Sequence, residues 1–406
     1  MNIGLVSTWL HRGAAYVTIN YAKLLKHNNN IFVYGRGGEY FDKSLKIDGI
    51  NVYEGCRTSY KDGIVISDFL NWIKKNNIEI VFWNEQRDLT AMCKTKLKFP
   101  HIIHGAYIDY YTEDSISDFQ LYDFVICNTK RHYSVFEWHK QAFYLPWGCD
   151  IDLYKQNRNK RNTSDKITFF HSMGMSNRKG TEVLIKTFIS NKFKELGAKL
   201  IIHTQINIDN IITKSEALNN NIEIIEKTVS APGLYYMGDV YVYPAKLDGL
   251  GLTLYEAISS GLPVITTDIA PMNEVINEQD GKLVKVKKLY SRSDGYYWPL
   301  AEVDEDSLRD ALMYYVTNAD KISTLSDNAR KEALNKWNWN NRKEELLRIF
   351  NNVKKLNTNE YCETYLKNKV RERRIKKRNA FIELFVPKKI FSLIKKQQVK
   401  RKYNLN

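Results

Sequence analysis

The chain has 406 residues, 43% of them hydrophobic, so two packed domains are more natural than a single core. Its net charge of +15 is uneven: the segment from Lys367 to Asn406 holds 15 Lys and Arg against two acids, which leaves +2 for the rest. Five scattered cysteines without a C-x-x-C pair argue against a disulfide framework or a zinc site, and for a reducing compartment. There is no signal peptide pattern and no run near the roughly 20 apolar residues that span a bilayer, so we expect a cytoplasmic protein.

In the first half of the chain, short apolar runs alternate with helical patterns, which is typical of a parallel sheet covered by helices. A polar stretch at 150–165 then predicts an interdomain linker, and residues 1–155 are expected to form a first, Rossmann-like domain. The expected strands are 3–6, 31–34, 80–83, 102–104, 124–127 and 143–145, and the expected helices are 14–27, 64–75 and 130–139.

The pattern restarts after the linker and predicts a second αβ domain over 166–336. Ligands of open αβ sheets lie at the carboxyl ends of strands, so a cleft between the two domains is the expected site. The expected strands are 167–170, 200–203, 222–225, 240–243, 264–267 and 283–286, and the expected helices are 181–190, 252–260, 304–317 and 321–336.

The most informative stretch runs from Val240 to Asp268 and predicts a strand, a glycine loop, a helix, a turn and a strand. Asp248 and Glu256 lie eight positions apart, astride the loop and the start of the helix. Free backbone N–H groups at a helix N-terminus attract phosphate, and a carboxylate further along can accept hydrogen bonds from a sugar hydroxyl. The pattern therefore favours a nucleotide or nucleotide-sugar site, with an ordinary αβ unit and a glycine turn as the alternative.

This stretch resembles the acidic-x7-acidic signature of family 4 (group 1) glycosyltransferases, which are retaining enzymes of the GT-B fold. The chain has Asp248 where that family usually has its first Glu. We expect Asp248 and the loop glycines Gly249 and Gly251 to face the transferred sugar. We expect Leu252 and Thr253 to present N–H groups to the diphosphate, and Glu256 to accept hydrogen bonds from the ribose.

A second glycine-containing loop, at 168–181, ends in Arg178 and Lys179 at a predicted helix start. Cations there oppose the helix dipole unless an anion is bound, and a diphosphate would supply one. The loop resembles the family's basic Lys-Gly motif, which neutralises the departing nucleotide diphosphate. Many members place the Arg about five residues before the Lys, where this chain has Gly174, and here Arg178 is adjacent to Lys179 instead. The alternative is two solvated surface cations.

Two positions of the first domain complete the expected site. His104 follows an apolar run and resembles the family's strand-end His near the donor sugar, where it would bind a sugar hydroxyl or help the acceptor lose its proton. Gly13 resembles the glycine loop that approaches phosphate and acceptor. A core histidine and a simple turn are the respective alternatives. The Asp150-x-Asp152 pair resembles the family's Gly-x-Asp turn at the domain junction, so we interpret it as structural and expect no metal.

These resemblances imply a retaining, hexosyl- or related glycosyltransferase that transfers a sugar from a nucleotide-diphosphate donor, with a UDP-sugar favoured, to a polysaccharide or glycolipid acceptor. No metal or other cofactor is expected. A catalytically silent nucleotide-sugar-binding subunit of a glycosyltransferase complex is the alternative, because Asp248 and Gly174 depart from the family pattern. The resemblance to GT-B enzymes implies that residues 1–155 bind the acceptor and residues 166–336 the nucleotide sugar. It also implies that residues 337–356 form a helix that crosses back to the first domain, with a helix that simply ends the second domain as the alternative.

The last segment, 357–406, is a basic tail. Its cations from 367 to 402 interleave with apolar residues, and Pro387 divides it into two short amphipathic pieces. This composition favours an anionic membrane surface, so a peripheral location at the inner face of the cell membrane is expected. Nucleic acid is a less favoured partner for the same charges, and a disordered solubilising tail is a third possibility.

Overall fold

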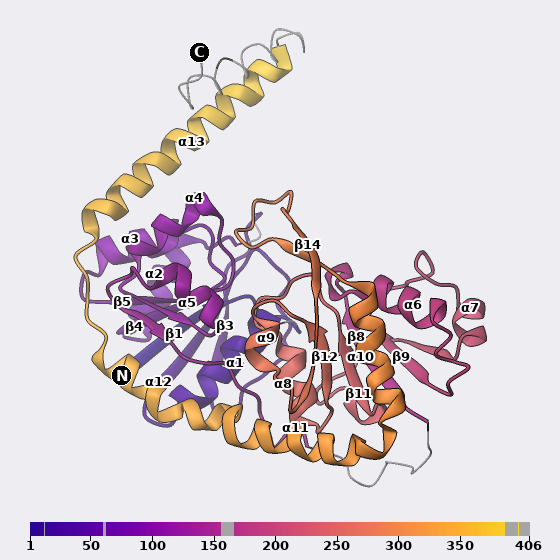
Figure 1. Ribbon diagram of the computed structural model, residues 1–406. Coiled ribbons are helices and arrows are strands. Elements are labelled where there is room, and N and C mark those ends of the chain that lie inside the picture. The colour runs from indigo at the N-terminus through magenta and orange to yellow at the C-terminus, as the bar shows by residue number, and fades with distance from the viewer. Residues whose placement is uncertain (12, 60–61, 156–165, 386–396, 398–406) are drawn as a thin grey trace.

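The chain forms two αβ units that lie side by side, with a long C-terminal helix that extends from the first of them (Figure 1). The computed structural model describes residues 1–11, 13–59, 62–155, 166–385 and 397. Most of the predicted linker, and the part of the tail around Pro387, lie outside the described residues.

The first unit is a seven-stranded parallel sheet of order β3-β2-β1-β4-β5-β6-β7. Its central strands are buried on both faces, which explains their continuous apolar runs. The strands are β1 (Asn2–Ser7), β2 (Asn30–Gly35), β3 (Asn51–Glu54), β4 (Ile80–Asn84), β5 (Ile103–Tyr107), β6 (Phe124–Cys127) and β7 (Ala142–Tyr144). The helices are α1 (Gly13–Leu25), α2 (Ile66–Lys75), α3 (Thr90–Lys98), α4 (Glu113–Ile116) and α5 (Lys130–Phe136).

The second unit is a six-stranded parallel sheet of order β10-β9-β8-β11-β12-β13. Its strands are β8 (Thr168–Gly174), β9 (Lys199–Thr204), β10 (Ile222–Glu226), β11 (Val240–Tyr243), β12 (Val264–Thr267) and β13 (Gly281–Val284). Its helices are α6 (Thr181–Ser190), α7 (Lys214–Asn219), α8 (Leu252–Ser259), α9 (Met272–Val275), α10 (Glu305–Thr317) and α11 (Ile322–Lys336).

An antiparallel hairpin of β14 (Val286–Tyr290) and β15 (Leu300–Val303) follows the second sheet. The prediction of a single strand at 283–286 is wrong, because these residues span the last two residues of β13, a connecting residue and the first residue of β14. The loop between β14 and β15 reaches the first unit, where Tyr297 N–H donates to the Tyr111 carbonyl at 3.0 Å. The hairpin therefore connects the two units beside the cleft.

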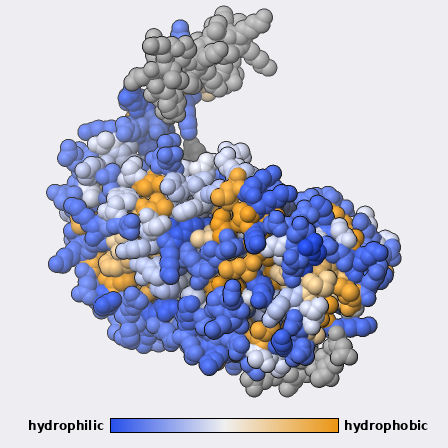
Figure 2. Space-filling model, viewed as in Figure 1, coloured by the Kyte–Doolittle hydropathy of each residue, from blue (hydrophilic) through white to orange (hydrophobic). Residues whose placement is uncertain are grey.

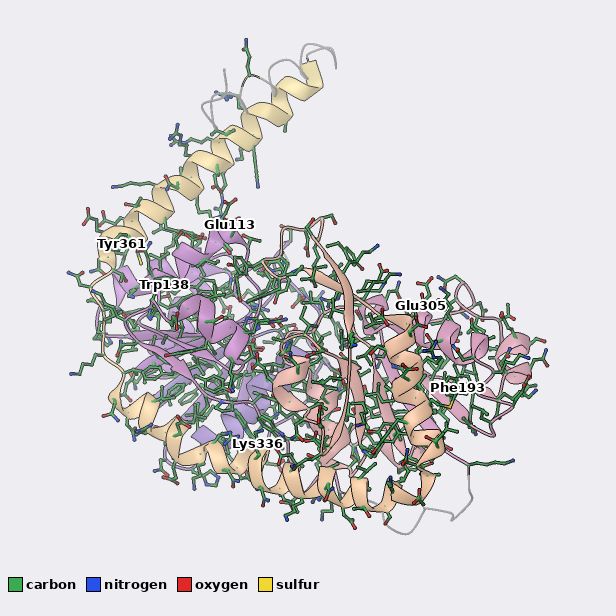
Figure 3. The ribbon with its side chains drawn as sticks, viewed as in Figure 1. Glu113, Trp138, Phe193, Glu305, Lys336 and Tyr361 are labelled. Carbon is green, nitrogen blue, oxygen red and sulfur yellow. The ribbon has the colours of Figure 1, made fainter. Side chains whose placement is uncertain are left out.

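The chain returns to the first unit through α12 (Lys343–Asn352), which packs against α1. Trp339 Nε1 donates to the Asn20 carbonyl at 2.9 Å, and the Phe350 ring packs edge-on against Phe82 and Phe124 under the first sheet. The final helix, α13 (Asn359–Phe385), begins near Tyr361, which is labelled in Figure 3, and extends away from the body.

Both strand orders reverse direction at one point, between β1 and β4 in the first sheet and between β8 and β11 in the second. In open αβ sheets, ligands bind outside the carboxyl ends of the strands at such a point. The loops after β1, β4, β8 and β11 are therefore the loops on which a site is expected, and they carry Gly13, Glu85, Lys179 and Asp248.

Candidate functional site

Lys179 and Asp248, which are 69 residues apart in sequence, meet at the carboxyl ends of β8 and β11. Lys179 Nζ lies 2.6 Å from Asp248 Oδ2, and the Tyr243 hydroxyl hydrogen-bonds to both groups. Both charged side chains are only 19% exposed. The structure thus brings together two of the predicted catalytic residues in a partly buried ion pair.

Gly180 allows this approach. Its φ of 78° lies in the left-handed region, and a Cβ at this position would collide with the carbonyl group of Pro244. The loops are also joined directly, because Lys246 N–H donates to the Arg178 carbonyl at 2.7 Å. A glycine at 180 is therefore required for the loop that holds Lys179 to lie against the loop that holds Asp248.

Burial raises the pKa of Asp248, but the Lys179 ammonium and the hydrogen bonds from Tyr243 and Gly249 outweigh this effect and lower the pKa to about 2. Gly249 N–H donates to Asp248 Oδ1 at 2.7 Å. Asp248 is therefore a carboxylate at neutral pH, and its charge is matched by Lys179.

The N-terminus of α8 stands between two cavities. Gly251, with a φ of 74°, precedes the helix, and no acidic side chain lies in the first turn. Leu252 and Thr253 line both cavities, one of about 410 Å³ and one of about 660 Å³. The helix end can therefore offer its positive pole to a ligand that extends from one cavity into the other.

The smaller cavity contains Glu256. Its two carboxylate oxygens accept hydrogen bonds from the hydroxyl groups of Tyr154 at 2.9 Å and Tyr235 at 2.5 Å. Burial raises the pKa of Glu256, while these two hydroxyl groups and Lys179 act in the opposite direction. Tyr154 lies in the segment that follows β7 of the first domain, whereas Tyr235 and Glu256 belong to the second, so residues from both sides of the junction hold this carboxylate.

The larger cavity contains Lys179 and Asp248 together with Gly13, Arg178 and Gly249. Arg178 is exposed, and its Nε donates to Ser176 Oγ at 3.4 Å. Gly13 is the first residue of α1, and a Cβ there would meet only Leu252, at an ordinary distance of 3.7 Å. The predicted residues other than His104 therefore line one of the two cavities or, like Gly251, immediately precede α8.

His104 is not part of this site, so its assignment as a catalytic residue is corrected. It is the second residue of β5, not the last, and it is fully buried. Trp83 Nε1 donates to its Nδ1 at 3.2 Å, and neither of the two cavities includes it. Burial, followed by the nearby cations Lys355 and Lys96, lowers the pKa of His104 well below its usual range. His104 is therefore a neutral residue of the core.

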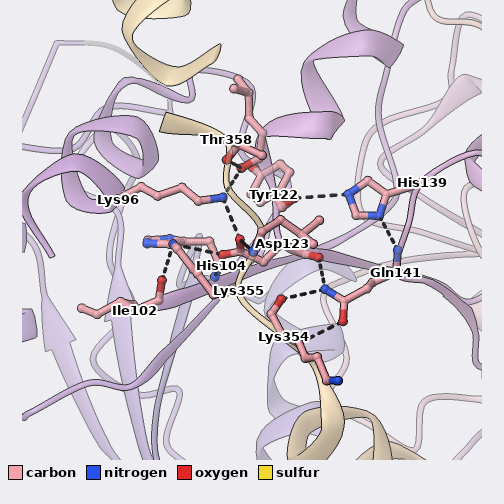
Figure 4. Close-up of polar contacts among 12 residues, drawn as sticks. Lys96, Ile102, His104, Tyr122, Asp123, His139, Gln141, Lys354, Lys355 and Thr358 are labelled. Carbon is pink, nitrogen blue, oxygen red and sulfur yellow. Dashed lines mark hydrogen bonds and ion pairs between the residues drawn. The ribbon is translucent and has the colours of Figure 1, made fainter. Parts of the chain in front are cut away.

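Figure 4 shows the polar cluster beside His104. Asp123 lies at its centre, fully buried, and pairs with Lys96 at 2.9 Å and with Lys355 at 3.3 Å. Asp123 Oδ2 also accepts the His104 backbone N–H at 2.7 Å. Because Lys355 lies between α12 and α13, the cluster fixes the returning chain to the first sheet.

Two acidic residues of the first domain line the larger cavity, where the sequence analysis expected His104. Glu85 directly follows β4, and Asp109 lies two residues after the end of the adjacent strand β5. Both residues line the larger cavity. Glu85 has a φ of 52°, a rare conformation for a residue with a side chain and one that is common at functional sites. Burial and the neighbouring Glu85 raise the pKa of Asp109 well above its usual range, so Asp109 holds a proton more readily than an exposed aspartate does.

Arg131, on α5 of the first domain, was also missed by the sequence analysis. Its guanidinium group crosses the cleft and donates to the carbonyl oxygens of Asp248 and Ala270, each at 2.6 Å. The neighbouring Glu274 of the second domain accepts the Arg131 backbone N–H at 2.8 Å. Arg131 therefore fixes the Asp248 loop relative to the first domain, and nothing in the local sequence distinguishes it from a surface cation.

Within the described ranges, no group of three or more His, Cys, Asp and Glu side chains is close enough to hold a metal ion. Asp150, from the Asp-x-Asp pair, accepts the Leu153 N–H at 3.1 Å and pairs with Lys23 at 3.3 Å. These contacts give Asp150 a role in the turn at the domain junction.

Part of the chain that forms this site is similar to a known protein family. Residues 164–292 match the family model described as glycosyl transferases group 1, and this range includes Lys179, Asp248 and Glu256. This part of the chain is therefore similar to the group 1 glycosyltransferases. It is 28% identical over 184 residues to the capsular polysaccharide biosynthesis glycosyltransferase CapM of Staphylococcus aureus, and this alignment covers 43% of each protein.

Solved structures resemble the chain over most of its length. A glycosyltransferase from Rickettsia africae has a TM-score of 0.69 at 17% identity, over 87% of this chain and 98% of that one. Anabaena HepE, in complex with UDP and glucose, has a TM-score of 0.66 at 12% identity, over 86% of this chain and 99% of that one. The architecture is GT-B, as the resemblance in the sequence implied.

Proposed function

We propose that this chain is a retaining glycosyltransferase that uses a nucleotide-diphosphate sugar and a polysaccharide or glycolipid acceptor. The observation that carries the proposal is the N-terminus of α8 between two cavities, with Lys179 and Asp248 in one and Glu256 in the other. A nucleotide-diphosphate sugar has its diphosphate between a ribose and the transferred sugar, and the positive pole of α8 between two cavities suits such a ligand.

In this proposal the smaller cavity binds the nucleoside, with the ribose at Glu256. The diphosphate lies against the N–H groups of Leu252 and Thr253, and the cations Lys179 and Arg178 compensate its charge without a metal ion. A UDP-sugar is the favoured donor, because HepE, which has a similar fold, is in complex with UDP and glucose.

The transferred sugar then lies in the larger cavity between Asp248 and the Glu85–Asp109 pair. When the bond between the sugar and the diphosphate breaks, Lys179 and the α8 N-terminus stabilise the charge that develops on the departing diphosphate. Glu85 and Asp109 face the side from which an acceptor hydroxyl can approach, and they position it. The proposed acceptor class agrees with that of CapM, a glycosyltransferase of capsular polysaccharide biosynthesis.

A thermal-shift panel of UDP, GDP, ADP and CMP and their common sugar conjugates tests the donor. A ligand at about 100 times its Kd stabilises the native state by about 2.7 kcal/mol, which such an assay detects. A selective response to UDP and its sugars, followed by release of UDP when an acceptor is added, is the expected result. Selective binding without turnover across an acceptor panel would favour the silent subunit, and no response to any nucleotide would refute the proposed donor site.

A further inference from the structure

The helix α13 carries a dense, exposed positive charge. Between Lys367 and Arg378 there are eight Lys and Arg residues and one acid, Glu372, a net charge of +7 over three turns. All of these cations are exposed except Lys369, which is half-buried. Figure 2 shows the described part of the projecting helix as hydrophilic, beyond the body of the molecule.

The chain itself does little to neutralise this charge. Among the described residues, the ion pairs of this stretch are Lys367–Glu363 at 3.8 Å, Lys369–Glu372 at 3.5 Å and Arg373–Asp88 at 3.7 Å, all of them long and solvated. Like charges three or four residues apart on a helix repel each other, so an anionic partner would stabilise this stretch. The cations without an ion pair to a described residue are Arg371, Arg374, Lys376, Lys377 and Arg378.

The base of α13 is fixed to the first domain. Cys362 and Tyr365 are buried, α13 packs along α3, and the Leu89 N–H donates to the Tyr365 hydroxyl at 3.0 Å. Leu89 and Asp88 belong to the segment that follows β4, and the same segment contributes Glu85 and Arg87 to the larger cavity. The charged helix therefore starts beside the side of the cleft that the proposed function assigns to the acceptor.

We propose that α13 docks the chain onto an anionic membrane surface and that this surface lies next to the acceptor side of the cleft. The charge attracts acidic lipid headgroups, and the attraction falls off within a Debye length of about 8 Å at physiological salt. No helix in the described part of the chain is long and apolar enough to cross a bilayer, which fits a peripheral contact.

The sequence of the same helix favours a lipid over a nucleic acid. Immediately after the basic stretch it continues with Phe381, Ile382, Leu384 and Phe385. Apolar and aromatic residues next to cations suit the boundary between headgroups and acyl chains, whereas a phosphate backbone rewards the cations alone. The location of the acceptor beside this surface rests on the proposed function, but the docking itself does not.

Co-sedimentation with lipid vesicles tests the docking on the full chain. Vesicles of phosphatidylcholine with 30% phosphatidylglycerol are compared with pure phosphatidylcholine at 50, 150 and 500 mM NaCl. The variant neutralises four cations of α13, and its matched control neutralises four exposed lysines of the body. The test substitutions are Arg374→Gln, Lys376→Gln, Lys377→Gln and Arg378→Gln, and the control substitutions are Lys186→Gln, Lys192→Gln, Lys194→Gln and Lys331→Gln.

Glutamine keeps the helix propensity of lysine and arginine, so the helix is retained in both proteins. The expected result is binding to the anionic vesicles that weakens with salt, falls at least tenfold in the α13 variant and changes less than twofold in the control. Equal loss in both variants, or equal binding to neutral vesicles, would overturn the proposal. Salt-dependent binding of the full chain to a 30-base-pair duplex without vesicle binding would assign α13 to nucleic acid instead. UDP binding, measured in parallel, separates failure of the docking from failure of the donor site.

Discussion

Replacement of Lys179 tests the centre of the proposed site most directly. In Lys179→Ala, the diphosphate loses a charge-assisted hydrogen bond of about 1.5–3 kcal/mol, which corresponds to a roughly 10- to 150-fold weaker Kd for UDP. The substitution also removes the cation 2.6 Å from Asp248, and the pKa of that carboxyl, now about 2, rises because the largest effect that opposes burial is lost.

The stability cost follows from the same contact. Breaking a fully buried ion pair costs about 3–5 kcal/mol, but both side chains here are 19% exposed, so a loss of about 1–3 kcal/mol is expected. Urea unfolding measures this loss separately from UDP titration by calorimetry. The folded fraction stays high at 25 °C if the wild-type stability is in the usual range of about 5–15 kcal/mol.

Two companion variants identify the cause of any change. Lys186→Ala removes an exposed lysine of α6 whose contact is with Glu305, and its UDP affinity is expected to equal that of the wild type. Asp248→Asn removes the carboxylate that competes for the Lys179 ammonium, so UDP binding is expected to be kept or strengthened while transfer of the sugar falls. Wild-type UDP affinity in Lys179→Ala would refute the reasoning and leave Lys179 as a structural partner of Asp248.

Three further predictions follow from other contacts. Gly180→Ala is expected to destabilise the protein and weaken UDP binding, because the added Cβ collides with Pro244. The control is Gly49→Ala, at a similar φ but with open space around it, which should lower stability only by the backbone cost of about 1 kcal/mol. Equal effects of the two substitutions would contradict the close approach of the two loops. Arg131→Ala should lower stability by about 2–4 kcal/mol and weaken UDP binding, and an unchanged UDP affinity would show that Arg131 does not position the Asp248 loop. Burial raises the pKa of Asp280 to about 6. The contribution of this group to the free energy of unfolding is therefore fully present below its unfolded pKa near 4 and is lost as the pH rises through 6. As the pH rises from 4 to 7.5, the free energy of unfolding of Asp280→Asn, measured in urea, should therefore increase by up to about 2–3 kcal/mol relative to that of the wild type. A difference between the two proteins that does not change with pH would disprove the pKa shift.

The sequence by itself determined the two αβ units and the loops that follow β8 and β11. Local signals were sufficient there, because a buried parallel strand reads as an apolar run and a glycine before a helix marks a loop that a ligand can approach. The helices α6 and α8 accordingly lie where they were predicted, to within one residue at each end. The same local signals located Lys179, Asp248 and Glu256.

Only the tertiary structure decided which residues of the first domain face them. The strand that contains His104 extends three residues further than predicted, because pairing with β4 and β6 continues to Tyr107. Asp109, which follows the end of this longer strand, therefore lies at the cleft in place of His104. Arg131 and the hairpin loop reach the cleft through contacts between segments more than 100 residues apart, for which a single sequence has no periodic signal. Local spacing reports the backbone path of one segment, whereas a site between two domains depends on how their faces meet.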